Sequence, residues 1–254
     1  MINNKYFTVE VLPLIPASKQ ALGAFADGDL LFDWTEFNMP RGAAKLVNAT
    51  ILTKSADGVQ NSHALNLYFS KQGRVQHELN STPKSIAPVT LGAIHGSASG
   101  RTSTANQLIG ACASEEVDQV VGLDFQTIQN LGHSTSNQTI ILESDTLSGE
   151  LADTEKFYVA GTSIDGTPNF ASTITCTGVQ AITQSVLTVG TTDPQVILAA
   201  GDVLHDENDR ALGTILNVAG STTINMTTNL LNATVNAKDV YCINPIRLIL
   251  QFER

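Results

Sequence analysis

The sequence has little cysteine, and the cysteines it has are widely spaced. Three cysteines form neither a CxxC pair nor a Cys/His ligand spacing, which argues against a disulfide framework and against a zinc site of the usual kind. We therefore interpret Cys112, Cys176 and Cys242 as small buried hydrophobic residues of a protein made in a reducing cytoplasm.

Long hydrophobic runs are also missing. The chain has no window of 18 uninterrupted apolar residues, and its first residues are not a basic stretch followed by an apolar core. We expect a soluble protein that is not exported by a cleaved signal peptide and that has no membrane partner.

Charge is scarce and mostly of one sign. Only 15% of the residues are charged, 24 acidic against 14 basic, and the formal net charge is −10. Lys and Arg are not gathered in a run interleaved with aromatic residues, so a nucleic-acid partner is not expected. Thr, Ser, Asn, Gln and Gly dominate between short apolar runs, a composition typical of β-rich secreted, adhesive or viral-coat proteins.

What the sequence does have is alternation of apolar and polar residues. In residues 6–11 and again in 246–252, every second side chain is apolar, which predicts a strand near each end of the chain. Residues 44–70 predict a hairpin around a turn at Asp57-Gly58. At 254 residues the chain is long enough for one large β domain or two modest ones.

Residues 180–244 have a denser pattern. Short β-rich segments, among them 195–198, are separated there by turn residues at regular intervals, as in a small SH3-like barrel. The predicted fold class is therefore all-β. We expect an antiparallel, jelly-roll-like β-sandwich domain made of residues 1–179 plus 245–254, with the small SH3-like β-barrel inserted before the last strand.

Two segments break the strand pattern. Prolines and spaced glycines make residues 71–100 a long surface excursion, of the kind that contacts a neighbour in an assembly. Asp124 as N-cap and Gly132 as the stop predict a short helix at 125–131, where apolar residues recur every third position.

A search for catalytic and ligand-binding motifs finds none. GxSxG, GxxxxGK[ST], HExxH and GxGxxG after a strand are absent from the sequence. We therefore predict no catalytic, cofactor-binding or metal-binding residues, and expect a protein that is not an enzyme and needs no cofactor. The histidines are scattered singly and are interpreted as surface or loop residues: His63, His77, His95, His133 and His205.

The acidic stretches allow two interpretations. Residues 205–210 (HDENDR) hold several oxygen donors that could bind Ca²⁺, but they lack the residue order of an EF-hand loop, and a solvated hairpin tip is favoured. Residues 27–29 and 57–58 are likewise interpreted as ordinary turns. The carboxylates within 115–118 could serve acid–base chemistry, but the sequence shows no partner for them and a solvated face is favoured.

One aromatic group also has two interpretations. Trp34, Phe37 and Met39 precede a Pro-Arg-Gly turn and could form a platform on which sugar rings stack. Their strand-like spacing favours packing in the core or at an interface instead.

Three stretches carry a resemblance to a known family. They are residues 5–13 (KYFTVEVLP), residues 32–46, which contain FDWT and PRGAAKL, and residues 157–172, which contain FYVAG and GTPNFAS. These stretches resemble virion proteins of marine tailed phages, particularly phages of cyanobacteria. The resemblance covers roughly the first 175 residues and the last ten. Residues 180–244 depart from the family, whose members run from the Ala-Ser stretch almost directly into the closing strand. This departure supports an insertion there.

The resemblance implies a structural protein of the virion, made in the host cytoplasm and placed on the outer surface of the head as a capsid decoration (cement) protein. Its partner is then the major capsid protein, and a homo-oligomer is expected, with a trimer as the guess from the class. The N-terminal segment and residues 71–110 are the candidate contacts. The alternatives are a tail or baseplate component, a glycan-binding adhesion module, or a polysaccharide hydrolase, for which no carboxylate pair can be chosen from sequence.

Overall fold

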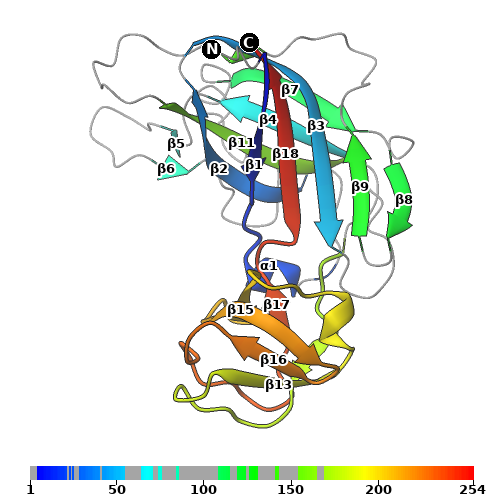
Figure 1. Ribbon diagram of the computed structural model, residues 1–254, viewed down its shortest axis with the longest axis vertical. Coiled ribbons are helices and arrows are strands. Elements are labelled where there is room, and N and C mark those ends of the chain that lie inside the picture. Colours follow the sequence, from blue (N-terminus) through cyan, green and yellow to red (C-terminus); the bar gives the residue numbers. More distant parts are fainter. Residues whose placement is uncertain are drawn as a thin grey trace.

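The computed structural model describes residues 5–21, 23, 25, 29–40, 42–54, 64–70, 74–75, 84–85, 108–114, 119–123, 126–130, 141–142, 154–164 and 169–254. Two bodies follow one another along the long axis of the molecule, a β-sandwich and a smaller β-barrel (Figure 1). The predicted all-β class, with antiparallel strands in a sandwich and a barrel, is confirmed.

The first sheet of the sandwich joins the two ends of the chain. Its strand order is β1-β18-β3-β9-β8, and β10 also pairs with β3. The register of β1 with β18 runs from Tyr6 opposite Glu253 to Val11 opposite Leu248, so the opening and closing strands belong to one sheet, as predicted. The strands are β1 (Tyr6–Val11), β3 (Ala44–Lys54), β8 (Gln119–Leu123), β9 (Gln126–Asn130), β10 (Ile141–Leu142) and β18 (Ile246–Glu253).

The second sheet has the order β2-β11-β4-β7 and shares one hydrophobic core with the first. In β18, the inward side chains of Ile246, Leu248, Leu250 and Phe252 are all 0% exposed, while the residues between them are wholly or partly exposed. The strands of this sheet are β2 (Leu30–Pro40), β4 (Ala64–Ser70), β7 (Leu108–Ser114) and β11 (Thr154–Ile164).

The barrel is a sheet of six strands in the order β12-β13-β16-β15-β14-β17, within residues 169–254, all of which are described. An antiparallel bridge between Thr175 and Asp239 brings the edge strands together and nearly closes it. Its separate core includes the fully buried Leu204, Leu212 and Ile224. The strands are β12 (Ile174–Cys176), β13 (Val186–Thr191), β14 (Val203–Asp206), β15 (Ala211–Gly220), β16 (Thr223–Met226) and β17 (Val240–Cys242).

In chain order the barrel lies between β11 and β18 of the sandwich. Its sheet spans residues 174–242. The predicted domain division, 1–179 plus 245–254 and 180–244, concerns units that fold on their own and stays a prediction.

Two predicted elements are wrong. Residues 126–130 form strand β9 and not a helix, because hydrogen bonding to β3 on one side and β8 on the other outweighs the local helical spacing. The apolar stretch 195–198 is not a strand. It overlaps the 3₁₀ helix η2 (Pro194–Val196), whose first turn Asp193 caps by accepting a hydrogen bond from the Gln195 N–H at 2.9 Å.

Shorter elements complete the described chain. The four-residue helix α1 (Ala17–Gln20) lies between β1 and β2 and was not predicted. Of the excursion predicted at 71–100, the structure describes a two-stranded ladder of β5 (Arg74–Val75) and β6 (Lys84–Ser85), and the rest lies outside the described residues.

A close approach inside the sandwich requires glycine. The pairing of β11 with β2 shifts register between Val159 and Gly161, which leaves Gly161 opposite Phe32. The buried Phe32 ring fills the space of the missing side chain, since a Cβ on Gly161 would lie 2.3 Å from a ring carbon. A larger residue therefore displaces the ring.

We expect Gly161→Ala to destabilise the protein by about 2–3 kcal/mol, because the added methyl overpacks a filled core. Gly220→Ala is the matched control, since nothing lies within 4 Å of its Cβ position, and it should change stability by less than about 1 kcal/mol. Calorimetry of both variants measures the difference. An equal melting temperature for Gly161→Ala and the unchanged protein would show that the Phe32 ring is not packed tightly against the backbone of Gly161.

Candidate functional site at the sandwich–barrel junction

The two bodies meet at a junction, where the passage of the chain from β1 to α1 lies beside its passage from β17 to β18. Backbone hydrogen bonds tie these passages together. The Ile15 N–H donates to the Ile243 carbonyl at 2.7 Å, and the Lys54 N–H donates to the Pro245 carbonyl at 2.8 Å. Ala17 of α1 is fully buried and packs in one cluster with Ile243. The junction is therefore ordered, hydrogen-bonded structure and not a free linker.

A buried ion pair crosses the junction. Lys54, at the end of β3, places Nζ 2.5 Å from both carboxylate oxygens of Asp202, which precedes β14. The Asp202 side chain is 8% exposed and that of Lys54 21%. The Ala199 N–H also donates to this carboxylate, at 2.8 Å. Because the Asp202 carboxylate is buried and its cation comes from the other body, this contact ties the barrel to the sandwich.

A groove of about 330 Å³ opens beside this ion pair. Glu10, Thr53 and Arg247 line it from the sandwich, and Gly201 lines it from the barrel. Arg247 and Glu10 are paired at 2.7 Å, while the buried Thr53 hydroxyl has no hydrogen-bond partner among the described residues. Because its charges neutralise one another, the groove suits water or a small neutral polar molecule.

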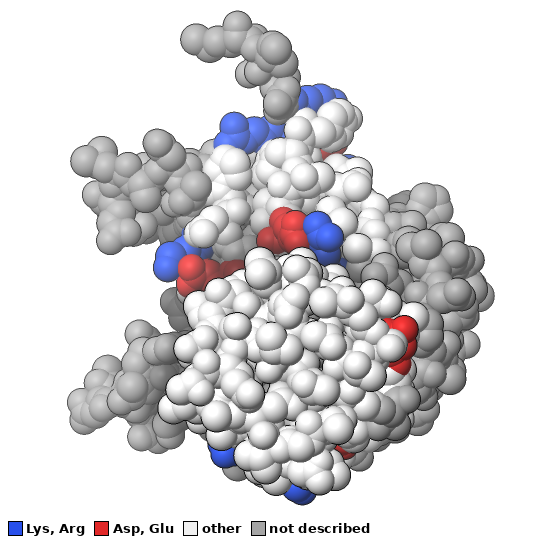
Figure 2. Space-filling model, turned by 60° about the horizontal axis from the view of Figure 1, so that its bottom comes forward, with Lys and Arg blue, Asp and Glu red and all other residues white. Residues whose placement is uncertain are grey.

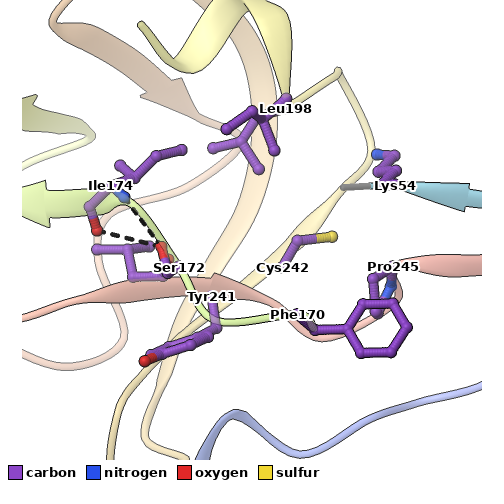
Figure 3. A pocket seen from close by; sticks show the side chains of 10 residues that line it. Lys54, Phe170, Ser172, Ile174, Leu198, Tyr241, Cys242 and Pro245 are labelled. Carbon is purple, nitrogen blue, oxygen red and sulfur yellow. Dashed lines mark hydrogen bonds between the residues drawn. The ribbon is translucent and has the colours of Figure 1, made fainter. Parts of the chain in front are cut away.

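A smaller cavity of about 30 Å³ lies inside the junction, with Phe170 and Leu198 among its apolar lining (Figure 3). It has room for about one or two water molecules. Ser172 also lines it, but its hydroxyl accepts a hydrogen bond from the Ile174 N–H at 3.0 Å and donates to the Val240 carbonyl. Ser172 therefore holds the start of the barrel in place and is not a free nucleophile.

The acidic stretch 205–210 forms the tip of the β14–β15 hairpin. The Asp206 carboxylate, buried at 5% exposure, accepts two backbone N–H groups of the tip at 3.0 Å each and the Arg210 guanidinium at 2.6 Å. Glu207 pairs with Lys238 at 2.5 Å. In the described part of the chain, no three His, Cys, Asp or Glu side chains are grouped so as to hold a metal ion.

The aromatic group of β2 is divided between two environments. Phe37 and Met39 lie in the sandwich core at 4% and 0% exposure, and the Phe37 ring packs edge-on against Phe69 with centroids 6.5 Å apart. Trp34 is half-buried and packs near Tyr68. The favoured interpretation, packing and not a single stacking platform, is confirmed for Phe37 and Met39.

The three cysteines are free thiols. Burial raises the pKa of Cys112 and of Cys242 from 9.0 to about 12, and that of Cys176 to about 11. At neutral pH these groups stay protonated, so they are poor nucleophiles.

Several candidates of the sequence analysis lie outside the described residues. They are residues 27–28, 57–58 and 115–118, together with His63, His77, His95 and His133. His205 lies on β14, and its Nδ1 atom is buried with no hydrogen-bond partner among the described residues.

Sequence reasoning missed the junction itself. Lys54 and Asp202 are 148 positions apart, and no local spacing signals an ion pair between such distant residues. The groove has no sequence signal for the same reason, because residues from both bodies line it.

No protein-family model, curated protein or solved structure matches the chain. Among the described residues, no helix combines the length and the apolar character needed to cross a bilayer. The function therefore has to be inferred from the sequence and from the geometry described above.

We expect Lys54→Met to destabilise the protein by about 2–4 kcal/mol, because the Asp202 carboxylate is then buried without its cation. Replacing both residues, Lys54→Met with Asp202→Leu, should recover a large part of the loss. Lys156→Met is the control and should have little effect, because the Lys156–Glu36 pair is solvent-exposed. Denaturant unfolding measures all three variants. Losses that simply add in the double variant would contradict a coupled pair.

We expect the thiols of the native protein to react with iodoacetamide at pH 8 at least about 100-fold more slowly than those of the unfolded chain. Their raised pKa values of about 11 and about 12 keep the thiolate fraction low, so the rate should keep rising about tenfold per pH unit until the pH approaches 11, whereas the rate of the unfolded chain should level off above about pH 9. Intact-mass spectrometry over time counts the labelled thiols. A cysteine that is labelled at the unfolded rate in the folded protein would disprove its shielding.

Proposed function

We propose that the chain is a non-enzymatic structural protein of a tailed-phage particle and acts as a decoration, or cement, protein on the outer surface of the head. Its partner is the major capsid protein. Docking of many copies stabilises the shell, because a ligand that binds only the assembled state shifts the equilibrium toward it. The resemblance of residues 5–13, 32–46 and 157–172 to virion proteins of marine tailed phages supports this class.

One observation carries the proposal: the molecule is an ordered unit of two bodies placed end to end (Figure 1). The Lys54–Asp202 pair and the junction hydrogen bonds hold the barrel in one orientation on the sandwich. The chain ends meet on the sandwich, where the Arg254 N–H donates to the Lys5 carbonyl at 2.8 Å. Such a unit can dock through its sandwich, with the N-terminal segment and residues 71–110 as candidate contacts, and present its barrel.

The polar groups at the junction also support a role without chemistry. Asp202 and Asp206 are each bound to a cation of the same chain, and the Ser172 hydroxyl is bound to backbone. The cysteine thiols are protonated at neutral pH. These two carboxylates and this hydroxyl are thus engaged in holding the structure together.

The surface of the barrel favours a protein partner over a sugar. Sugar sites usually present aromatic faces to the rings of the ligand. Residues 171–244 contain a single aromatic residue, Tyr241, which is 3% exposed. This observation disfavours placing a glycan site on the barrel.

Co-sedimentation with phage heads stripped of accessory proteins tests the decoration role. We expect saturable binding at a stoichiometry that matches lattice positions, and saturated heads should open at a higher temperature than stripped ones. Heads of an unrelated phage control for non-specific adsorption. Binding to tails or baseplates alone, or to no part of the particle, would overturn the proposal.

A further inference from the structure

Two long stretches of the barrel are free of charge: residues 171–192 and 211–237 contain no Asp, Glu, Lys or Arg. Figure 2 shows a broad uncharged area here, with charged side chains at its margins. In a chain with a net charge of −10, this part of the barrel is a local exception.

Two loops lie side by side in this part of the barrel, one before β13 and one between β16 and β17. The Gln180 N–H donates to the Thr234 hydroxyl at 3.0 Å, and the Thr234 N–H donates to the Gln180 carbonyl at 3.1 Å. The Gly178 N–H also donates to the Asn236 side chain, at 2.7 Å. These contacts place residues 178–180 beside residues 234–236, so Val179 and Val235 lie in neighbouring parts of the two loops.

The same loops expose aliphatic side chains. Val179 is 74% exposed, Ile182 56%, Leu231 61% and Val235 45%, and we name these four residues the barrel-end patch. Single exposed aliphatic residues are common on proteins. Four of them on adjacent loops, within stretches of the sequence that contain no charged residue, have the composition of a protein contact surface.

The patch is held in place by the buried side chain of Gln180, which is 6% exposed. Its Nε2 donates to the carbonyls of Thr177 and Thr188 at 3.1 and 2.9 Å, and its Oε1 accepts from the Thr188 N–H at 3.0 Å. These bonds tie the loop to β13. A patch that is ordered before binding loses little conformational entropy on binding, which favours association.

We propose that the barrel-end patch binds the same patch on a second copy of this chain, so that the protein self-associates through its barrels. The charge distribution favours a second copy of this chain as the partner of the patch. Two copies with a net charge of −10 each repel one another in most orientations, and their uncharged ends are where they can meet with the least repulsion. An aliphatic patch is also complementary to itself, as a symmetric contact requires.

This inference rests on the proposed function and deepens it, because it supplies a contact for the homo-oligomer that the resemblance to virion proteins implies. The self-association and the decoration role can nevertheless be disproved independently of one another. Self-association is measured on the purified chain alone, whereas the decoration role is measured on phage heads.

Sedimentation equilibrium of the purified full chain tests the inference. We expect a mass that is a multiple of the single chain and an association that strengthens with added NaCl, because salt screens the net charge without weakening an apolar contact. The double variant Val179→Glu/Val235→Glu should weaken association by about 100-fold or more, since each copy must then bury two carboxylates.

Val47→Glu/Ile141→Glu is the matched control, because Val47 on β3 and Ile141 on β10 of the sandwich are 44% and 54% exposed and should accept the same added charge without loss of association. Unchanged thermal melts show that the variants fold. A chain that stays monomeric at every salt concentration overturns the inference, and so does an oligomer that survives the double variant or that is weakened equally by the control. If the unchanged chain is monomeric and the double variant loses head binding, the occupant of the patch is the capsid and self-association is overturned.

Discussion

The position of β18 between β1 and β3 is the constraint on which the rest of the structure depends. The last strand of the chain pairs along one side with the first strand and along the other with β3, and its inward side chains are fully buried. The sheet is complete only when the chain has left the sandwich, formed the barrel and returned. The barrel is therefore bounded by two strands of the same sandwich, and its entry and exit are fixed by sheet pairing.

The same strands position the junction. β3 ends at Lys54, and the Lys54 N–H bonds to the carbonyl of Pro245, the residue just before β18. Strand pairing thus positions the lysine side chain beside Asp202 of the barrel. A buried ion pair adds little net stability compared with apolar packing, but it forms only when the two charged groups are well aligned. Its contribution here is orientation, because it ties the barrel to one place on the sandwich.

The sequence allowed the fold class to be predicted because alternation reports which face of a strand is buried. β1 and β18 follow that pattern, and each buries one face. Residues 126–130 do not, since their apolar spacing also fits a helix and only the neighbours β3 and β8 decide in favour of a strand. The Lys54–Asp202 contact could not be predicted, because it is created by the return of the chain across 148 positions. The uncharged stretches 171–192 and 211–237, by contrast, are visible in the sequence.

Charge is distributed unevenly along the molecule, so the sandwich and the barrel end differ in the charge of their surfaces. On the sandwich and near the junction, charged side chains are used in pairs, such as Lys5 with Glu253 and Glu10 with Arg247. The barrel end has aliphatic side chains in place of such pairs. The excess negative charge keeps copies apart in most orientations, which opposes indiscriminate aggregation. In the proposed self-association, the uncharged barrel end is where two copies approach with less repulsion, so the charge distribution favours that surface.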